Sequence, residues 1–337
     1  MATYRIDHTG AIPSSYVNHA WANAAAVAAA DPAPVFSTDR AGDYPNQIIN
    51  GVALSNASYI DTVGGDYTIG LDVSVAAAWQ PGPGTTMTGG KIRGGGRDSI
   101  RLQAGCTLTR IGVEWQIVDA GYGYGCRLNG AGAALVDLNC KISTGGTGAK
   151  VLSAVVRIRP GAVATSVTWE NVGVTSDIQC AYGAIHAWEG TPSIIIRGCG
   201  EGSNSALETL LYVSAGLTLP VLTIQGSHAR ELVRAAGAMT VTAGTFAHNV
   251  YEHTAAGTSS ATDKGGIVDR RLGGIDGLTP LHDSPLRNVI PLADTVGTQK
   301  YDMYGNPRYR GRRQCVGPVQ PQDIAKYRFS RGLAAVA

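Results

Sequence analysis

A glycine followed by apolar residues at fixed spacing recurs seven times between Gly84 and Phe246. The seven glycines lie 21 to 29 residues apart, at Gly84, Gly105, Gly132, Gly161, Gly190, Gly216 and Gly237. Apolar residues follow three, six and eight places later, as in Leu108, Ile111 and Val113 or Leu135, Leu138 and Cys140. Short strand-like segments of this period are typical of a solenoid, in which each repeat buries its apolar face against the next. The pattern therefore predicts stacked β-coils with these positions facing the core.

The segments on either side of the repeat differ from it. Pro13 and Ser14 precede an Ala-rich segment that ends at Asp31 and Pro32, which predicts an N-capped helix. This helix either covers the open end of the solenoid or anchors the chain in an assembly. We expect an N-terminal cap or anchor in residues 1–45, a β-helix in 46–275, and a C-terminal cap with a basic arm in 276–337.

Composition agrees with an all-β chain. Charged residues make up 15% of the sequence and 45 residues are glycine, which favours short strands and tight turns over a helical bundle or a disordered chain. The N-terminus shows no charged segment followed by an apolar one, so we expect no secretion signal. The longest apolar runs are far shorter than the ~20 residues that span a bilayer, so membrane insertion is not expected.

The six cysteines show neither a close CxxC pair nor the spacing of zinc ligands, so we expect no metal site and no cofactor. Cys140 and Cys199 share an inward position of the repeat. They are interpreted as small core residues. The alternative is a disulfide between neighbouring coils.

Charged residues occupy one further position of the repeat, nine places after the glycine. Successive repeats carry Arg93, Glu114, Lys141 and Glu170 there. Because stacked strands lie ~4.8 Å apart, alternating signs at one position predict a charge ladder. The alternative is a solvated face on which each pair contributes little.

A local cluster of Tyr182, His186, Trp188 and Glu189 is the candidate binding site. Aromatic rings beside an acid can stack on a sugar and hydrogen-bond to it, so the cluster is a candidate glycan site. The alternative is that His186 and Trp188 only cover the edge of a turn. We assign no catalytic residue, because no pair of carboxylates falls at matching positions of adjacent coils.

The C-terminal segment is basic, with eight Lys and Arg residues against two Asp in residues 300–337. Such a segment favours docking to a neighbouring copy or to an acidic partner, with nucleic acid as the weaker alternative. The candidate assembly contacts are Trp21, Arg308, Arg310, Arg312 and Arg313.

The same segment carries a family resemblance. Its motifs are Ser284-Pro285-Leu286-Arg287-Asn288, then Asp302 with Gly305-Asn306-Pro307-Arg308, then Val316-Gly317. Together with the coil pattern, they resemble the right-handed parallel β-helix proteins of the pectate-lyase-like kind. Arg287 and Asn288 depart from the family's usual Ile-Asp. The resemblance implies a single-stranded right-handed parallel β-helix with a short N-terminal helix and a C-terminal cap or arm.

The family includes phage tailspikes and other virion spikes as well as polysaccharide lyases and hydrolases. The resemblance, with no secretion signal expected, implies a bacteriophage virion protein of the spike or fibre kind, attached to tail or capsid and made in the host cytoplasm. Its expected partners are other virion proteins, a host-surface glycan and two further copies in a homotrimer. The alternative is a tailspike polysaccharide depolymerase.

Overall fold

The structure is a computed structural model of the 337-residue chain. It describes residues 3–6, 16–17, 35–38, 42–44, 58–60, 65–69, 80–95, 100–118, 123–145, 153–159, 161, 163–176, 180–203, 206–207, 209–273, 277–287, 289–291, 294, 302–304, 306–307 and 313–320. Within these ranges the chain is all-β, as predicted, and no described residue lies in a helix. The described residues accordingly offer no helix able to cross a membrane.

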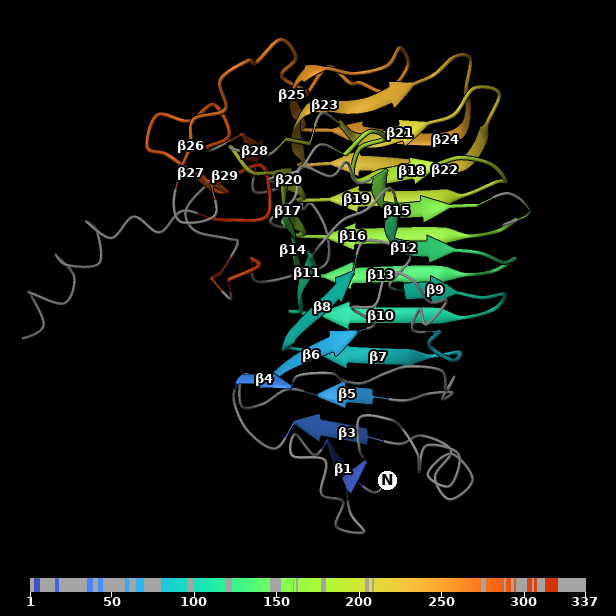
Figure 1. Cartoon of the computed structure of the whole chain (residues 1–337). Helices are drawn as coiled ribbons and strands as arrows, with labels where there is room; N and C mark the ends of the chain where they lie inside the picture. The colour runs from blue at the N-terminus through green and yellow to red at the C-terminus, as the bar shows by residue number, and fades with distance from the viewer. Residues whose placement is uncertain are drawn as a thin grey trace, which may run out of the picture.

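Eleven parallel strands form the first sheet (Figure 1). Their spatial order is β2 (Tyr16–Val17), β1 (Thr3–Ile6), β3 (Val35–Thr38), β5 (Ser58–Ile60), β7 (Thr85–Thr88), β10 (Thr107–Ile111), β13 (Ala134–Leu138), β16 (Ser166–Glu170), β19 (Ser193–Arg197), β22 (Thr218–Gln225) and β24 (Thr240–Ala247). From β7 to β22, each strand pairs with the strand three places later in the chain, so the sheet grows by one strand per repeat.

The second sheet has fourteen parallel strands in two stacks that meet at β23 (His228–Ala235). One stack is β4 (Gly42–Tyr44), β6 (Gly65–Ile69), β8 (Lys91–Gly95), β11 (Glu114–Val118), β14 (Lys141–Gly145), β17 (Gly173–Ser176) and β20 (Gly200–Glu201). The other is β9 (Ile100–Leu102), β12 (Tyr124–Leu128), β15 (Ala154–Ile158), β18 (Ile185–Ala187) and β21 (Thr209–Val213), while β25 (Val250–His253) pairs with β23. Three successive strands thus form one rung, and the rungs stack. This topology is consistent with a β-helix-like fold.

Six of the seven repeated glycines, all except Gly237, have a left-handed backbone. Gly105 and Gly132 have φ of 69° and 70°, and a Cβ at Gly105 would have no atom within 4 Å. Conformation rather than space therefore selects glycine there. One rung later the matching position, two residues before the paired strand start, is Ala164 with φ of 53°. The glycine of that repeat, Gly161, lies three residues earlier and also has a positive φ, of 77°.

The core runs along the inside of the rungs. Aligned positions of the first sheet supply one fully buried column, namely Leu108, Leu135, Val167, Ile194 and Leu222. At the sixth place after the glycine, the prediction holds for Val167 and Leu222, which are fully buried, and is wrong for Ile111 and Leu138. Ile111 is 38% exposed, and in these two repeats the inward position is the fifth, occupied by Arg110 and Asp137. Side chains alternate along a strand, so positions three and five share a face and position six does not.

Arg110 and Asp137 form an ion pair inside the core. They lie opposite each other on β10 and β13, and the guanidinium donates two hydrogen bonds, of 2.7 and 2.8 Å, to the carboxylate. The indole of Trp115 lies 4.2 Å from the guanidinium carbon. The two side chains are 1% and 0% exposed. Because each charge is buried, each depends on the other.

All six cysteines are buried and free, which confirms their interpretation as core residues and excludes the disulfide alternative. Cys140 and Cys199 stack in one column, with Val172 between them, as the pairing of β14, β17 and β20 requires. Burial raises the pKa of the Cys140 thiol to about 12, so the thiol stays protonated.

The predicted N-terminal helix is wrong where the structure describes it. Tyr16–Val17 form β2, which pairs with β1, and the rest of the expected helix, including Trp21, lies outside the described residues. Strands β1 to β4 already belong to the two sheets. Parallel pairing therefore includes the described residues of the segment from which a cap or anchor was expected, namely 3–6, 16–17, 35–38 and 42–44.

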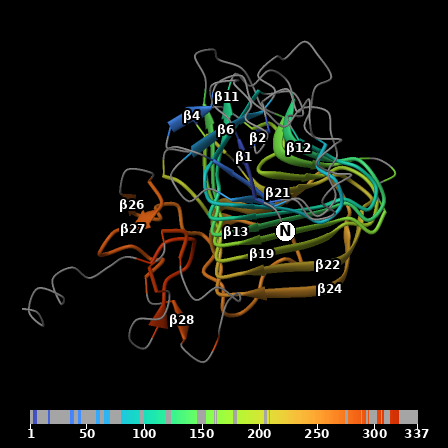
Figure 2. The same ribbon diagram turned by 90° about the horizontal axis from the view of Figure 1, so that it is seen from below.

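The described C-terminal residues pack along a flank of the rungs (Figures 1 and 2). They contain two short antiparallel pairs, β26 (Leu272–Gly273) with β27 (Thr279–Pro280), and β28 (Ile290–Pro291) with β29 (Arg313–Gln314). Leu278 and Met303 lie against Gly173, where an added Cβ would be 2.6 and 2.9 Å from them. Gly317 lies against the buried His228 and donates a backbone hydrogen bond to Gly226.

Asp302, from the resembling motif, has a structural role in this segment. Its carboxylate accepts hydrogen bonds from the backbone N–H groups of Tyr304, Asn306 and Gln320, at 2.8 to 2.9 Å. The side chain is almost fully buried. The motif therefore fixes the fold of the C-terminal segment.

We expect Asp137→Asn to lower the free energy of unfolding by about 3–5 kcal/mol, because it leaves the Arg110 charge buried without its counter-ion. The matched control is Glu114→Gln, which weakens the surface contact of Glu114 with Lys141 at 4.0 Å and costs at most about 1 kcal/mol. Denaturant titration of both variants measures the difference. Equal losses would contradict this account of the core.

Candidate functional site

Three of the four predicted glycan-site residues lie together at β18. His186 stacks on Tyr182, with ring centroids 4.4 Å apart, and lies 6.2 Å from Trp188 in a near-parallel arrangement. Glu189 is exposed at the following turn, and the structure gives it no contact with the rings. The structure thus brings the three rings together.

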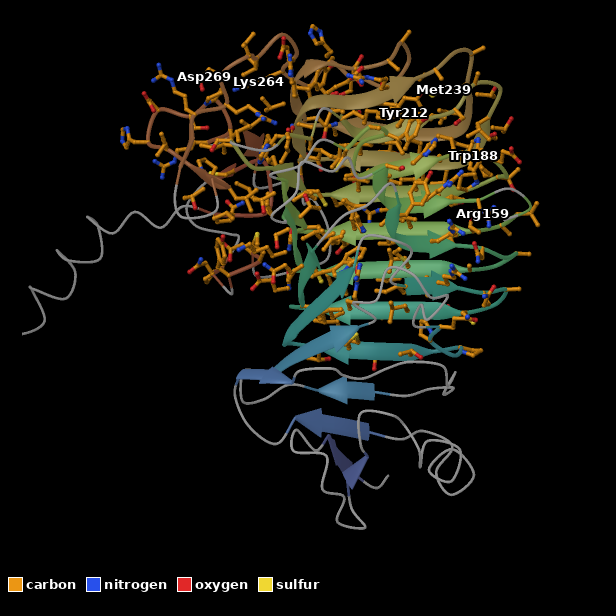
Figure 3. The ribbon with its side chains drawn as sticks, in the orientation of Figure 1. Arg159, Trp188, Tyr212, Met239, Lys264 and Asp269 are labelled. Carbon is orange, nitrogen blue, oxygen red and sulfur yellow. The ribbon has the colours of Figure 1, made fainter. Side chains whose placement is uncertain are left out.

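Tyr212 completes the cluster, and the sequence analysis missed it. Its ring meets Tyr182 and His186 edge-on, at 5.1 and 5.2 Å. Tyr212 lies on β21 directly opposite His186 on β18. Aligning the strand of each repeat that carries His186 would have found it. Figure 3 shows Tyr212 and Trp188 on the same flank, with Arg159 close by.

Register places the cluster in a longer column. The residues at the His186 position of the stacked strands are, in order, Arg101, Arg127, Arg157, His186, Tyr212 and Arg234. Each has buried apolar neighbours in sequence, such as Ile185 and Ala187 around His186, which hold the strand against the core. The outward side chains of six rungs therefore form one strip of cations and rings.

Arg157 joins the cations to the rings. Its guanidinium carbon lies 3.5 Å from the centroid of the Trp188 ring and 4.2 Å from that of Tyr124. Such contacts contribute about 0.5–2 kcal/mol each, the more the drier the site. Arg157 is almost buried, whereas Tyr182 is 38% exposed and Trp188 and Arg159 are half-buried. The strip therefore combines a nearly buried arginine, which holds the rings in place, with the partly exposed rings of Tyr182 and Trp188.

His186 is neutral in this setting. Burial and the nearby Arg157 charge lower its pKa to about 4. Its Nε2 lies 3.2 Å from the Ser214 hydroxyl, and its buried Nδ1 has no hydrogen-bond partner among the described residues. At neutral pH the ring therefore acts as a flat surface and a hydrogen-bonding group.

Three buried acids form ion pairs with arginines away from the rings. Asp137 pairs with Arg110, Glu170 with Arg197 at 3.0 Å, and Glu201 with Arg270 at 2.9 Å. Asp119, Asp177 and Glu208 lie outside the described residues. No described group of three or more His, Cys, Asp or Glu side chains has the arrangement of a metal site. The strip through His186 therefore has the geometry for ring stacking and for contacts with charged groups.

The four members of the predicted charge ladder do not form one column. Glu114 pairs with Lys91 and Lys141, and its carboxylate lies 4.0 Å from the Lys141 ammonium. Arg93 lies opposite Gln116, and Glu170 belongs to the first sheet, opposite Leu138 and Arg197. Unequal turn lengths shift the register between repeats, so counting from the glycine does not align them.

Most predicted assembly contacts lie outside the described residues, namely Trp21, Arg308, Arg310 and Arg312. Arg313 lies on β29, where its backbone pairs with Pro291.

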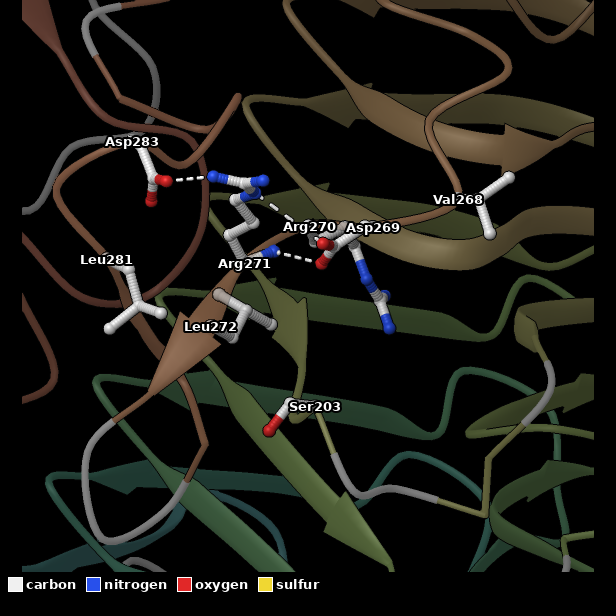
Figure 4. Close-up of a pocket in the computed structure, with 8 residues that line it drawn as sticks. All are labelled: Ser203, Val268, Asp269, Arg270, Arg271, Leu272, Leu281 and Asp283. Atoms are coloured by element: carbon white, nitrogen blue, oxygen red, sulfur yellow. Dashed lines mark hydrogen bonds and ion pairs between the residues drawn. The ribbon is translucent and has the colours of Figure 1, made fainter.

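A shallow cavity of about 410 Å³ lies between the C-terminal segment and the rungs (Figure 4). Its lining is Ser203, Val268, Asp269, Arg270, Arg271, Leu272, Leu281 and Asp283. Arg271 forms ion pairs with Asp269 and Asp283, and Arg270 reaches the buried Glu201. The charges of this cavity thus neutralise one another and hold the segment in place.

We expect stability to fall as pH drops from about 6.5 to about 4, with His186 contributing. Its pKa is lower in the folded chain than in the unfolded one, so the unfolded chain binds the extra proton in this range. His186→Phe keeps a flat ring but cannot titrate. Unfolding midpoints between pH 7 and pH 4 should therefore fall less steeply for this variant than for the wild type. Equal slopes would contradict the lowered pKa.

Comparisons of the chain with protein-family models, with curated proteins and with solved structures found no match.

Proposed function

We propose that the protein is a non-catalytic spike or fibre-like component of a bacteriophage virion that binds a host-surface glycan. The chain is interpreted as a right-handed, single-stranded parallel β-helix of the pectate-lyase-like kind, a rigid rod whose flank carries the binding surface. What supports this architecture is the parallel pairing rung upon rung. What supports the phage assignment is the resemblance of residues 284–317 to that family.

The observation that carries glycan binding is the stacked cluster of Tyr182, His186, Trp188 and Tyr212. Flat rings held on rigid strands bind the apolar face of a sugar, and their preset geometry lowers the entropy cost of binding. The guanidinium of Arg159 on the same flank can form charge-assisted hydrogen bonds. We therefore favour a glycan that carries carboxylates.

The alternative, a polysaccharide depolymerase, needs two carboxylates about 5–9.5 Å apart or an acid cluster that holds Ca²⁺. Asp137, Glu170 and Glu201 each serve an arginine instead, which favours binding without cleavage. A homotrimer attached to tail or capsid remains part of the proposal. Trimeric virion spikes of this fold supply the analogy.

We expect Trp188→Ala combined with Tyr182→Ala to weaken glycan binding about tenfold or more, since stacked rings contribute about 0.5–1.5 kcal/mol each beyond the area they bury. Binding is measured on a panel of neutral and uronate-containing polysaccharides. Tyr304→Ala is the matched control, because it removes a tyrosine that is 46% exposed on the C-terminal segment.

The same incubations are assayed for new reducing or unsaturated ends. Release of oligosaccharide would favour the depolymerase alternative. Failure of the wild-type protein to bind any polysaccharide of the panel, or unchanged binding by the double variant, would contradict the proposed site.

A further inference from the structure

The last strand of the first sheet has an open edge. β24 pairs with β22 on one side, and no described strand pairs with its other side. It is eight residues long, and its sequence, Thr-Val-Thr-Ala-Gly-Thr-Phe-Ala, contains no charge and no proline. Edge strands are normally protected by charges, prolines, bulges or shortness, because unpaired N–H and C=O groups recruit other strands. β24 has neither charges nor prolines, and it is not short.

The side chains of β24 leave the core unfinished. Thr242, Ala243, Gly244 and Thr245 are exposed. Val241 and Phe246 lie over the fully buried Leu219 and Ile224, yet each is only partly buried. Two apolar positions that are fully buried in β22 are thus only partly covered in β24.

At this end of the stack, the second sheet is covered by further pairing. β25 adds to β23, and Lys264 continues the pairing through a bridge to Val250. Ala255 packs against the core and donates its N–H to Val233. The chain therefore covers the second sheet and leaves β24 without such a cover among the described residues.

We propose that β24 is a dimer interface, on which a second copy of this chain pairs antiparallel through its own β24. A head-to-tail arrangement would set the eight residues of β24 against β2, a strand of two residues at the opposite end of the sheet. A two-fold arrangement pairs eight residues with eight, and an interface of this kind is self-complementary. Two uncharged edges also meet without repulsion.

The two-fold arrangement has a natural register. In an antiparallel pair the two-fold axis passes through one residue, which then faces its own copy, because hydrogen-bonded and non-hydrogen-bonded pairs alternate along the ladder. If that residue is Ala243, Thr242 of one copy lies opposite Gly244 of the other, and Val241 lies opposite Thr245. Exposed and partly buried residues of both copies are then covered together. The proposal does not depend on glycan binding.

Light scattering after size exclusion tests the interface on the full chain. We expect a mass of twice 34.9 kDa, or six times if the flanks also trimerise. Thr242→Lys with Thr245→Lys should halve that mass, because lysines on an edge strand oppose its pairing with another edge. Thr88→Lys, an equally exposed threonine on the internal strand β7, should leave it unchanged.

Cross-linking tests the register independently. An Ala243→Cys variant should form a covalent dimer on mild oxidation, since the two-fold axis would bring the two introduced thiols within disulfide reach. The six native cysteines are buried and should not compete. A Thr88→Cys variant is the control. A wild-type protein that is a monomer or a simple trimer, or a cysteine variant that does not cross-link, would overturn the proposal.

Discussion

Parallel hydrogen bonding between successive rungs is the constraint on which the rest of the structure depends. Once β10 pairs with β13 and β13 with β16, each side chain must lie above a particular residue of the previous rung. Side chains at the same position of successive rungs therefore stack into a column that runs along the molecule. Inward columns hold leucine, isoleucine and valine, and the outward one through His186 holds arginines and rings. Core and binding surface are set by one register.

The same constraint explains why polar groups are tolerated inside. Arg110 is acceptable in an apolar column because the next rung supplies Asp137 at the same place, and Trp115 covers the guanidinium. An isolated charge there would carry a large desolvation cost. On the outer face, Arg157 shares one of these means, contact with aromatic rings, whereas its column neighbours are Arg127 and His186 rather than an acid. Stacked rungs make such contacts repeatable.

The sequence predicted the stacked parallel strands, the core cysteines and most of the ring cluster, since these follow from the repeat or from near neighbours. It failed where register depends on turn length. The repeat cannot show that Arg110 replaces Ile111 inside, because a polar residue at a core position is explained only by its partner 27 residues away. Tyr212 and the separation of Glu170 from Lys141 were also missed, because both depend on the register between rungs, which turn length sets. The capping residues predicted a helix, but Tyr16 pairs with β1 as a strand instead, because tertiary context overrides local propensity.

A stack of repeats has little reason to melt as one unit, because each rung contacts only its neighbours. The C-terminal segment changes this. It lies against Gly173, the buried Glu201 and His228, three successive rungs, and it reaches them from Arg270, Leu278, Met303 and Gly317. One segment therefore contacts three rungs at once and connects them directly. By linking these three rungs directly, the segment should make them unfold together.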